Sequence, residues 1–175
     1  MTQGHGFPIT GRLRNLGSAP SLGVDLESGV SGEMFSVARL ALATQRALDN
    51  AHSKETQNQL PSTSTIYCKE ALEWITIRGA QALKLDHKVG SLSVGKQADL
   101  VMIDATQLNM FPVHQAVNSV IMQTSLSNID SVMVAGEFKK RHGKLLHPKL
   151  EEGKQMLIES GKRLLSELKN HPTHA

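Results

Sequence analysis

The 175-residue chain has few of the features that mark several common classes of protein. Its single cysteine, Cys68, excludes an internal disulfide and is typical of a reducing compartment. Aromatic residues make up only 3% of the sequence, which argues against the stacking platforms that bind single-stranded nucleic acid. No apolar run reaches the roughly 18 residues of a membrane span, and the N-terminus lacks the pattern of a signal peptide. We therefore expect a cytoplasmic protein that binds neither nucleic acid nor membranes.

The first fifty residues change from a short apolar segment to an amphipathic one. A short helix is predicted around residues 10–16, and residues 20–25 predict a buried strand that ends on Asp25. A longer helix is predicted from its N-cap Ser31 to about Asn50. A strand followed by a helix is one unit of a parallel sheet, so these residues must belong to a larger arrangement.

A polar loop or linker over residues 51–66 leads into a second predicted helix over residues 68–85. Gly79 and Ala80 lie in the middle of that helix. Because glycine costs about 1 kcal/mol there, it indicates close approach to another backbone.

Short strands with turn residues between them are predicted from residue 89 onward. Residues 98–103 predict a buried strand, residues 116–122 form a second apolar run, and residues 129–146 predict a hairpin that turns around 135–136. A final helix over residues 147–170 carries a narrow leucine stripe, so we expect it to pack on something rather than stand alone.

Four segments carry the motifs of one family, in the same order. Residues 4–42 contain Gly-x-Asp after an apolar segment and then an acidic-Met-Phe triplet that opens a helix. Residues 71–85 contain Thr-x-x-Gly-Ala, residues 89–104 contain VGSLSVGKQADLVMID, and residues 129–146 have the pattern of a closing hairpin. Together they resemble the C-terminal part of the amidohydrolase superfamily, in the branch of triazine hydrolases and adenosine- or guanine-type deaminases.

This resemblance implies an α/β fold that is the end of a metal-dependent (β/α)8 barrel. Residues 1–50 would supply the last barrel strand and helix, residues 51–66 a linker, and residues 67–88 the post-barrel helix. Residues 89–146 would form strands of a small β-sandwich domain, followed by a C-terminal helix and tail over residues 147–175.

The resemblance assigns Asp25 to the metal site. Chemistry in such barrels collects at the C-terminal ends of the strands, where a carboxylate can ligate a metal and take a proton from the water it activates. On spacing alone, an Asx-turn or N-cap role explains Asp25 better than a metal site does. The resemblance favours the metal-site role, with one divalent metal, zinc or iron, in the intact parent protein. His5 lies on a loop that borders the substrate pocket in the family, so it is a candidate substrate-binding residue; a flexible-loop histidine is the alternative.

The remaining ligands of that site are missing from the sequence. The family supplies a His-x-His pair and further histidines from earlier barrel strands, and this chain contains no His-x-His. A catalytic zinc site typically needs three protein ligands, and the barrel needs roughly 200 residues or more. We therefore expect a fragment that binds no metal and is inactive alone, and whose partner is the missing N-terminal barrel segment or a second copy.

The parent protein would hydrolyse C–N bonds of a small heterocycle or amide through a metal-bound hydroxide. The alternative is a non-catalytic α+β interaction module that keeps the core of the family without its chemistry.

Several conspicuous residues are better explained by structure than by catalysis. Glu33 is a favourable charge in the first turn of a helix, and Lys96 and Asp99 serve a turn and a strand start. The basic run 139–144 is a solvated hairpin face that protects a sheet edge. Cys68 has no identifiable histidine partner and is expected to be inert.

Overall fold

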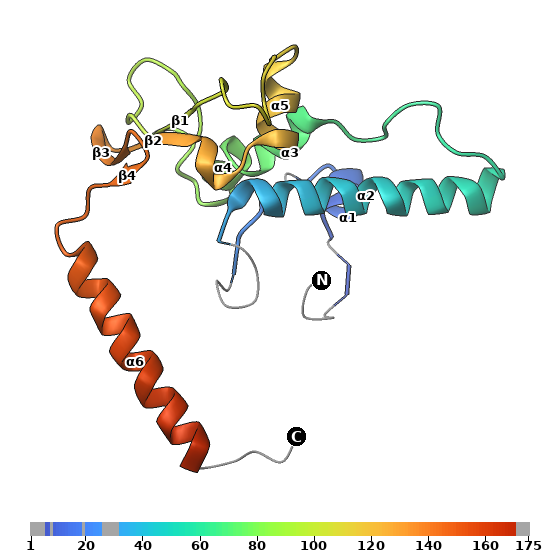
Figure 1. Cartoon of the computed structure of the whole chain (residues 1–175). Coiled ribbons are helices and arrows are strands. Elements are labelled where there is room, and N and C mark those ends of the chain that lie inside the picture. The colour runs from blue at the N-terminus through green and yellow to red at the C-terminus, as the bar shows by residue number, and fades with distance from the viewer. Residues whose placement is uncertain (1–5, 8, 19, 26–31, 171–175) are drawn as a thin grey trace.

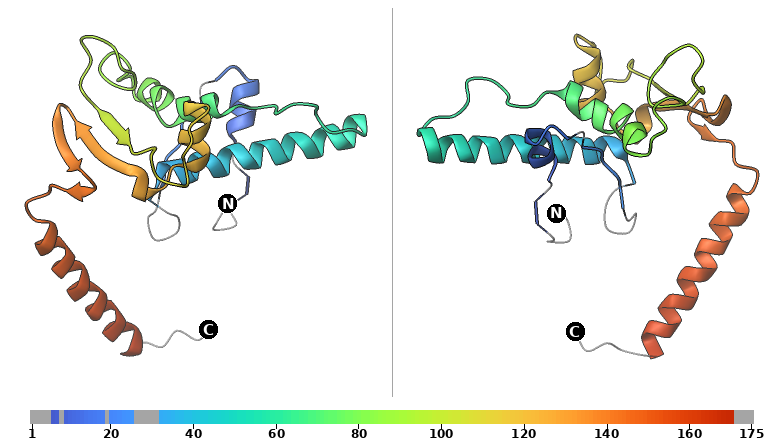
Figure 2. Two further views of the ribbon diagram at one scale, coloured as in Figure 1. Left: turned by 45° about the horizontal axis from the view of Figure 1, so that its top comes forward. Right: turned by 180° about the vertical axis from the view of Figure 1, so that it is seen from behind.

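The computed structural model describes residues 6–7, 9–18, 20–25 and 32–170. The described part contains a helical body, a small antiparallel sheet and a long C-terminal helix that extends away from both (Figures 1 and 2). None of the helices in these ranges is both long and apolar enough to cross a membrane. The elements are α1 (Thr10–Asn15), α2 (Met34–Gln57), α3 (Cys68–Trp74), α4 (Ile77–Ala82), β1 (Leu100–Ile103), α5 (Ala116–Gln123), the 3-10 turn η1 (Leu126–Asn128), β2 (Ile129–Val134), β3 (Glu137–Arg141), β4 (Lys144–Leu145) and α6 (Leu150–Asn170).

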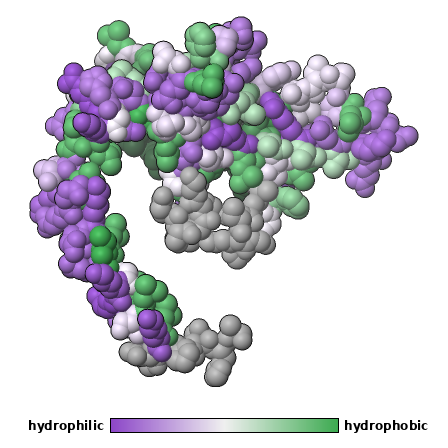
Figure 3. All heavy atoms as spheres, viewed as in Figure 1, coloured by the Kyte–Doolittle hydropathy of each residue, from purple (hydrophilic) through white to green (hydrophobic). Residues whose placement is uncertain are grey.

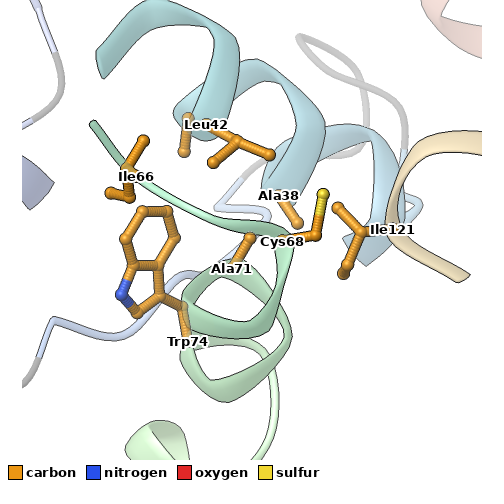
Figure 4. Packing of buried hydrophobic residues seen from close by; sticks show 8 residues of the cluster. Ala38, Leu42, Ile66, Cys68, Ala71, Trp74 and Ile121 are labelled. Atoms are coloured by element: carbon orange, nitrogen blue, oxygen red, sulfur yellow. The ribbon is translucent and has the colours of Figure 1, made fainter. Parts of the chain in front are cut away.

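The hydrophobic core lies where α2, α3 and α5 meet. Small residues on α2 and α3 let these helices approach closely, and larger side chains from all three fill the remaining space. Figure 4 shows Cys68 beside Ala38 and Ile121, so this thiol is buried among apolar neighbours. The buried cluster consists of Ala38, Ala41, Leu42, Ile66, Cys68, Ala71, Trp74 and Ile121.

Two arginines of α2 join that helix to its neighbours. Arg46 donates through Nε and Nη2 to the carbonyl oxygen of Ile66, at 3.1 and 2.9 Å, just before α3 begins. Arg39 donates through Nη1 to the carbonyl oxygens of Ile121 and Thr124, at 3.1 and 2.7 Å. Because the last carbonyls of a helix have no partner within it, Arg39 caps the C-terminal end of α5.

The sheet has the order β1-β2-β3-β4, and every neighbouring pair is antiparallel. The predicted hairpin is confirmed: β2 and β3 are joined by Ala135 and Gly136, with φ of 50° and 85°. Two positive φ angles match the twist of the strands, and glycine supplies the second at no steric cost. The Asp99 carboxylate accepts the Ala135 N–H at 2.6 Å, which holds this turn against the start of β1.

The predicted strand over residues 20–25 is wrong. These residues lie outside the sheet, and the Leu22 N–H instead donates to the Trp74 carbonyl at 3.4 Å. A strand requires a neighbour that completes its hydrogen bonds, and β1–β4 form a separate antiparallel sheet. The apolar pattern therefore identified a segment that packs against the core, but not its conformation.

The helix boundaries near residues 51–66 also differ from the prediction. Helix α2 continues through residues 51–57 and ends where Asn58 takes a left-handed φ of 54° and donates its N–H to the Lys54 carbonyl at 3.1 Å. Asparagine adopts this C-terminal conformation more readily than most residues. The predicted N-cap Ser31 lies outside the described residues.

The single helix predicted over residues 68–85 is in fact two, α3 and α4. They separate at Ile75 and Thr76, in a run of three β-branched residues that disfavours helix. The predicted close approach at Gly79 is also wrong, because a Cβ there would meet nothing within 4 Å. The close approach is at Gly90, whose hypothetical Cβ would lie 2.6 Å from the Ala80 Cβ.

Two further predicted segments, residues 116–122 and the C-terminal helix, are both helical in the structure. The apolar run over residues 116–122 forms helix α5, because Ile121 packs into the core between α2 and α3. The C-terminal helix is confirmed as α6, but it extends away from the body instead of packing on it (Figure 1).

Candidate functional site

Asp25 lies at the exposed end of a segment that is held against the core. Pro20 is buried, Leu22 is partly buried, and the N–H of Leu22 bonds to α3 through the Trp74 carbonyl. Asp25 itself is exposed and has a φ of 67°, in the left-handed region that aspartate enters more easily than most residues. The Asp25 carboxylate therefore faces solvent. It lies only three residues after Leu22, whose backbone N–H is bonded to α3. The second predicted site residue, His5, lies outside the described residues.

The chain before Asp25 is fixed by a hydrogen-bonded series between α1, α2 and the segment after α2. The Gly11 N–H donates to Gln45 Oε1 at 3.1 Å, and Gln45 Nε2 donates to Asp49 Oδ1 at 2.7 Å. Thr65 Oγ1 donates to the other oxygen of Asp49 at 2.5 Å. A Cβ on Gly11 would lie 2.1 Å from the Gln45 side chain, so a larger residue there would displace the Gln45 amide and its hydrogen bond to α1.

A small cavity of 120 Å³ lies beside the same segment, between α1, Pro20 and α3. Two ion pairs line it: Arg14 Nε to Glu70 Oε2 at 2.6 Å, and Arg78 Nη2 to Glu73 Oε2 at 3.1 Å. Both carboxylates are thus already paired with guanidinium groups. This arrangement positions the segment that leads to Asp25, and sequence reasoning missed it because Arg14 and Glu70 are 56 residues apart.

Contacts of Glu33 fix the start of α2, which follows residues 26–31 that lie outside the described ranges. Glu33 is the residue before the helix, and its carboxylate accepts from Ser36 Oγ at 2.7 Å and from Arg39 Nη2 at 3.2 Å. Since Arg39 also caps α5, this contact joins the entry of α2 to the C-terminal end of α5. Glu33 is therefore part of an ion-paired network rather than a charge within the first turn.

No complete metal site exists within the described ranges. No three histidine, cysteine, aspartate or glutamate side chains there come close enough together to hold a metal ion. Asp25 is the one candidate ligand from the sequence that is described, and one carboxylate does not fit the three-ligand requirement of a catalytic zinc. The described histidines are scattered over helices, loops and the hairpin: His52, His87, His114, His142 and His147.

The other conspicuous polar features do not contribute to a site around Asp25. A shallow depression of 400 Å³ beside α5 is lined mainly by amides and by the His114 imidazole, and it does not include Asp25. Lys96 Nζ donates to the carbonyl oxygen of Asp86, and also to Ser91 Oγ at 2.7 Å. Lys96 therefore holds the turn before β1, and its structural role is confirmed together with that of Asp99.

Known proteins that resemble this chain indicate its family. The model of the amidohydrolase family matches residues 5–139. The 5'-deoxyadenosine deaminase of Methanobrevibacter smithii is 35% identical over 101 residues, which are 57% of this chain and 22% of that protein. A 5-methylthioadenosine/S-adenosylhomocysteine deaminase of Shouchella clausii is 27% identical over 94% of this chain and 33% of its own length.

Solved structures show the same fold. An adenosine deaminase from Xanthomonas campestris with bound zinc superposes with a TM-score of 0.72 at 24% identity, over 94% of this chain and 34% of that one. A zinc complex of atrazine chlorohydrolase from Arthrobacter aurescens gives a TM-score of 0.64 at 19% identity, over 79% of this chain and 29% of that one. The chain thus spans no more than about a third of the relatives it matches. Since the family model covers more than half of the sequence, the chain belongs to the amidohydrolase family.

Proposed function

We propose that the chain is one part of a hydrolase that deaminates a small heterocyclic compound, such as an adenosine-type nucleoside. Membership of the amidohydrolase family supports hydrolysis of a C–N bond. Relatives named as deaminases of 5'-deoxyadenosine and of 5-methylthioadenosine support the substrate class. Displacement of another leaving group from a heterocycle or amide is the related alternative, supported by the likeness to a triazine-type enzyme.

Asp25 is the residue through which this chain takes part in the reaction. A divalent metal, when bound, lowers the pKa of a water molecule and so makes it a nucleophile at neutral pH. The Asp25 carboxylate would be one ligand of that metal and would take a proton from the water. The other ligands would come from polypeptide outside the described residues, because these hold no group of three ligands.

One observation carries this proposal. Asp25 is exposed at the end of a segment fixed by Leu22, inside the region that matches the family. A turn residue needs no such anchored neighbour, whereas a metal ligand must be held in place by its surroundings.

The proposal is tested by co-producing this chain with the N-terminal two thirds of the Xanthomonas campestris adenosine deaminase. The purified complex is assayed for metal content and for ammonia release from adenosine. We expect Asp25→Asn to lose both while the complex still forms. Glu55→Gln removes a different exposed carboxylate, on α2, and should change neither.

The absence of a metal-ligand group from the described residues favours one second candidate, a non-catalytic interaction module. In that case the complex would form without metal and without turnover, and Asp25→Asn would have no effect.

A further inference from the structure

Helix α6 carries an apolar stripe that the rest of the described chain leaves uncovered. Leu157, Leu164 and Leu168 are 74%, 52% and 58% exposed, and Leu150 lies on the same side of the helix. Spacings of seven and four residues place these leucines within about 40° of one another around a helix of 100° per residue. We call these four leucines the α6 stripe. Gly153 and Gly161 lie within it, and a Cβ on either would meet nothing within 4 Å.

A hollow separates α6 from the helical body (Figure 3). In Figure 3 the hydrophobic atoms of α6 gather on the side of the helix toward that hollow, and hydrophilic atoms cover the outer side. The face opposite the stripe consists of Gln155, Glu159, Lys162 and Ser166. In proteins most of the stability of a helix comes from packing of its apolar face, so the uncovered apolar face of the 21-residue α6 points to a partner on that face.

A second uncovered stripe lies on α2. Leu40 is 44% exposed, and Ala43, Ala47 and Ala51 follow it at helical spacing and are also exposed. This stripe is distinct from the buried side of α2, which packs on α3 and α5. The described residues therefore leave two separate helical faces open, and a partner that covers both must be broader than one added helix.

The superposition with the Xanthomonas campestris enzyme indicates what that partner is. Coverage of 94% leaves out fewer residues than α6 contains, so at least part of α6 holds the same place in that structure. The matched region is 34% of that polypeptide, so about two thirds of it remains to pack around the shared part. We infer that the α6 stripe is the docking surface for the N-terminal barrel portion of an amidohydrolase-family protein. The inference rests on the proposed function, because it names the polypeptide that would supply the other metal ligands.

The test again co-produces this chain with the N-terminal two thirds of the Xanthomonas campestris adenosine deaminase and measures how much of it co-purifies. The double variant Leu157→Lys/Leu164→Lys should reduce recovery about tenfold or more, the effect of losing one or two buried leucines. The matched control Gln155→Lys/Ser166→Lys adds the same charge to the opposite face and should leave recovery unchanged. Trp74 fluorescence checks that the body is folded in every variant, since Trp74 is buried away from α6.

Three outcomes would overturn the inference: equal recovery with both double variants, loss of recovery with the control alone, or an α6-dependent homodimer that excludes the barrel portion. The Asp25→Asn variant separates this inference from the proposed function. If Asp25→Asn keeps turnover while the stripe variants lose the complex, the proposed function fails and the docking surface stands. If the complex forms equally well with the stripe variants but Asp25→Asn still abolishes turnover, the docking surface fails and the proposed function stands.

Discussion

Replacing Gly90 by alanine should destabilise the chain strongly, whereas the same change at Gly79 should not. Gly90 follows α4 and has a φ of 87°, a region that side chains rarely enter. Its added Cβ would lie 2.6 Å from the Ala80 Cβ and 3.1 Å from the Ile77 Cα, and Ile77 and Ala80 both belong to α4. Gly79 lies inside the same helix with open space around it.

The magnitude follows from two contributions. A left-handed backbone costs an ordinary residue about 1–2 kcal/mol, and overpacking costs typically about 1–3 kcal/mol. Gly90→Ala should therefore lower the free energy of unfolding by about 2–5 kcal/mol. Gly79→Ala relieves a mid-helix glycine and should raise it by up to about 1 kcal/mol.

Urea unfolding followed by Trp74 fluorescence measures both variants, because this is the only tryptophan in the chain and it is 3% exposed. With a slope of about 2 kcal/mol per molar urea, the midpoint of Gly90→Ala should fall by about 1–2.5 M. The reasoning would be refuted if Gly90→Ala lowered the free energy of unfolding by less than about 0.5 kcal/mol. It would also be refuted if Gly79→Ala lowered it by more than Gly90→Ala does.

Two further predictions concern the polar groups around the sheet. Asn128 is fully buried; it donates through Nδ2 to the Asp104 carbonyl at 3.2 Å and accepts the Ser125 N–H at 2.9 Å. Asn128→Leu leaves both of these backbone groups unpaired. It should lower the free energy of unfolding by about 2–5 kcal/mol, measured in the same urea assay. Hydrogen bonds from the Thr106 hydroxyl and N–H lower the pKa of Asp104 below its ordinary 3.8. The resulting stabilisation is present above pH 3.8 and disappears as the pH falls through the lowered pKa. Unfolding of Asp104→Asn across pH 2–7 should lack this dependence, and equal pH profiles for the two proteins would contradict it.

Local signals in the sequence predicted the elements that need no distant partner. Alternating apolar residues around Ala135-Gly136 predicted the β2–β3 hairpin, and leucines at helical spacing predicted α6. The start of α3 at Cys68 followed from the same periodicity. Each of these depends on residues within a few positions of one another.

Other elements depend on contacts that no short window contains. The segment over residues 20–25 was predicted as a strand, but its bond to Trp74 comes from a helix about fifty residues later. The helix that the apolar run of α5 forms packs on α2 and α3 through Ile121, and its C-terminal carbonyls are capped by Arg39, more than eighty residues earlier. The ion pair of Arg14 with Glu70 left no local signal either.

The candidate site, too, was only partly predictable from the sequence. Gly-x-Asp before an acidic-Met-Phe triplet singled out Asp25, and the family match includes that residue. Its function as a metal ligand remains a prediction, as does that of His5. No group of three candidate ligands occurs among the described residues, so this part of the chain does not define a complete metal site.

The central claim is that this chain contributes Asp25 to the metal site of a family hydrolase. It is tested most directly by metal content and ammonia release from adenosine, measured on the complex with the Xanthomonas campestris barrel portion. The account predicts bound metal and turnover in the wild-type complex, and a fall in turnover of at least about 100-fold with Asp25→Asn, since even outer groups of metal sites cost 10–100-fold. Retention of metal and turnover by the Asp25→Asn complex would contradict it.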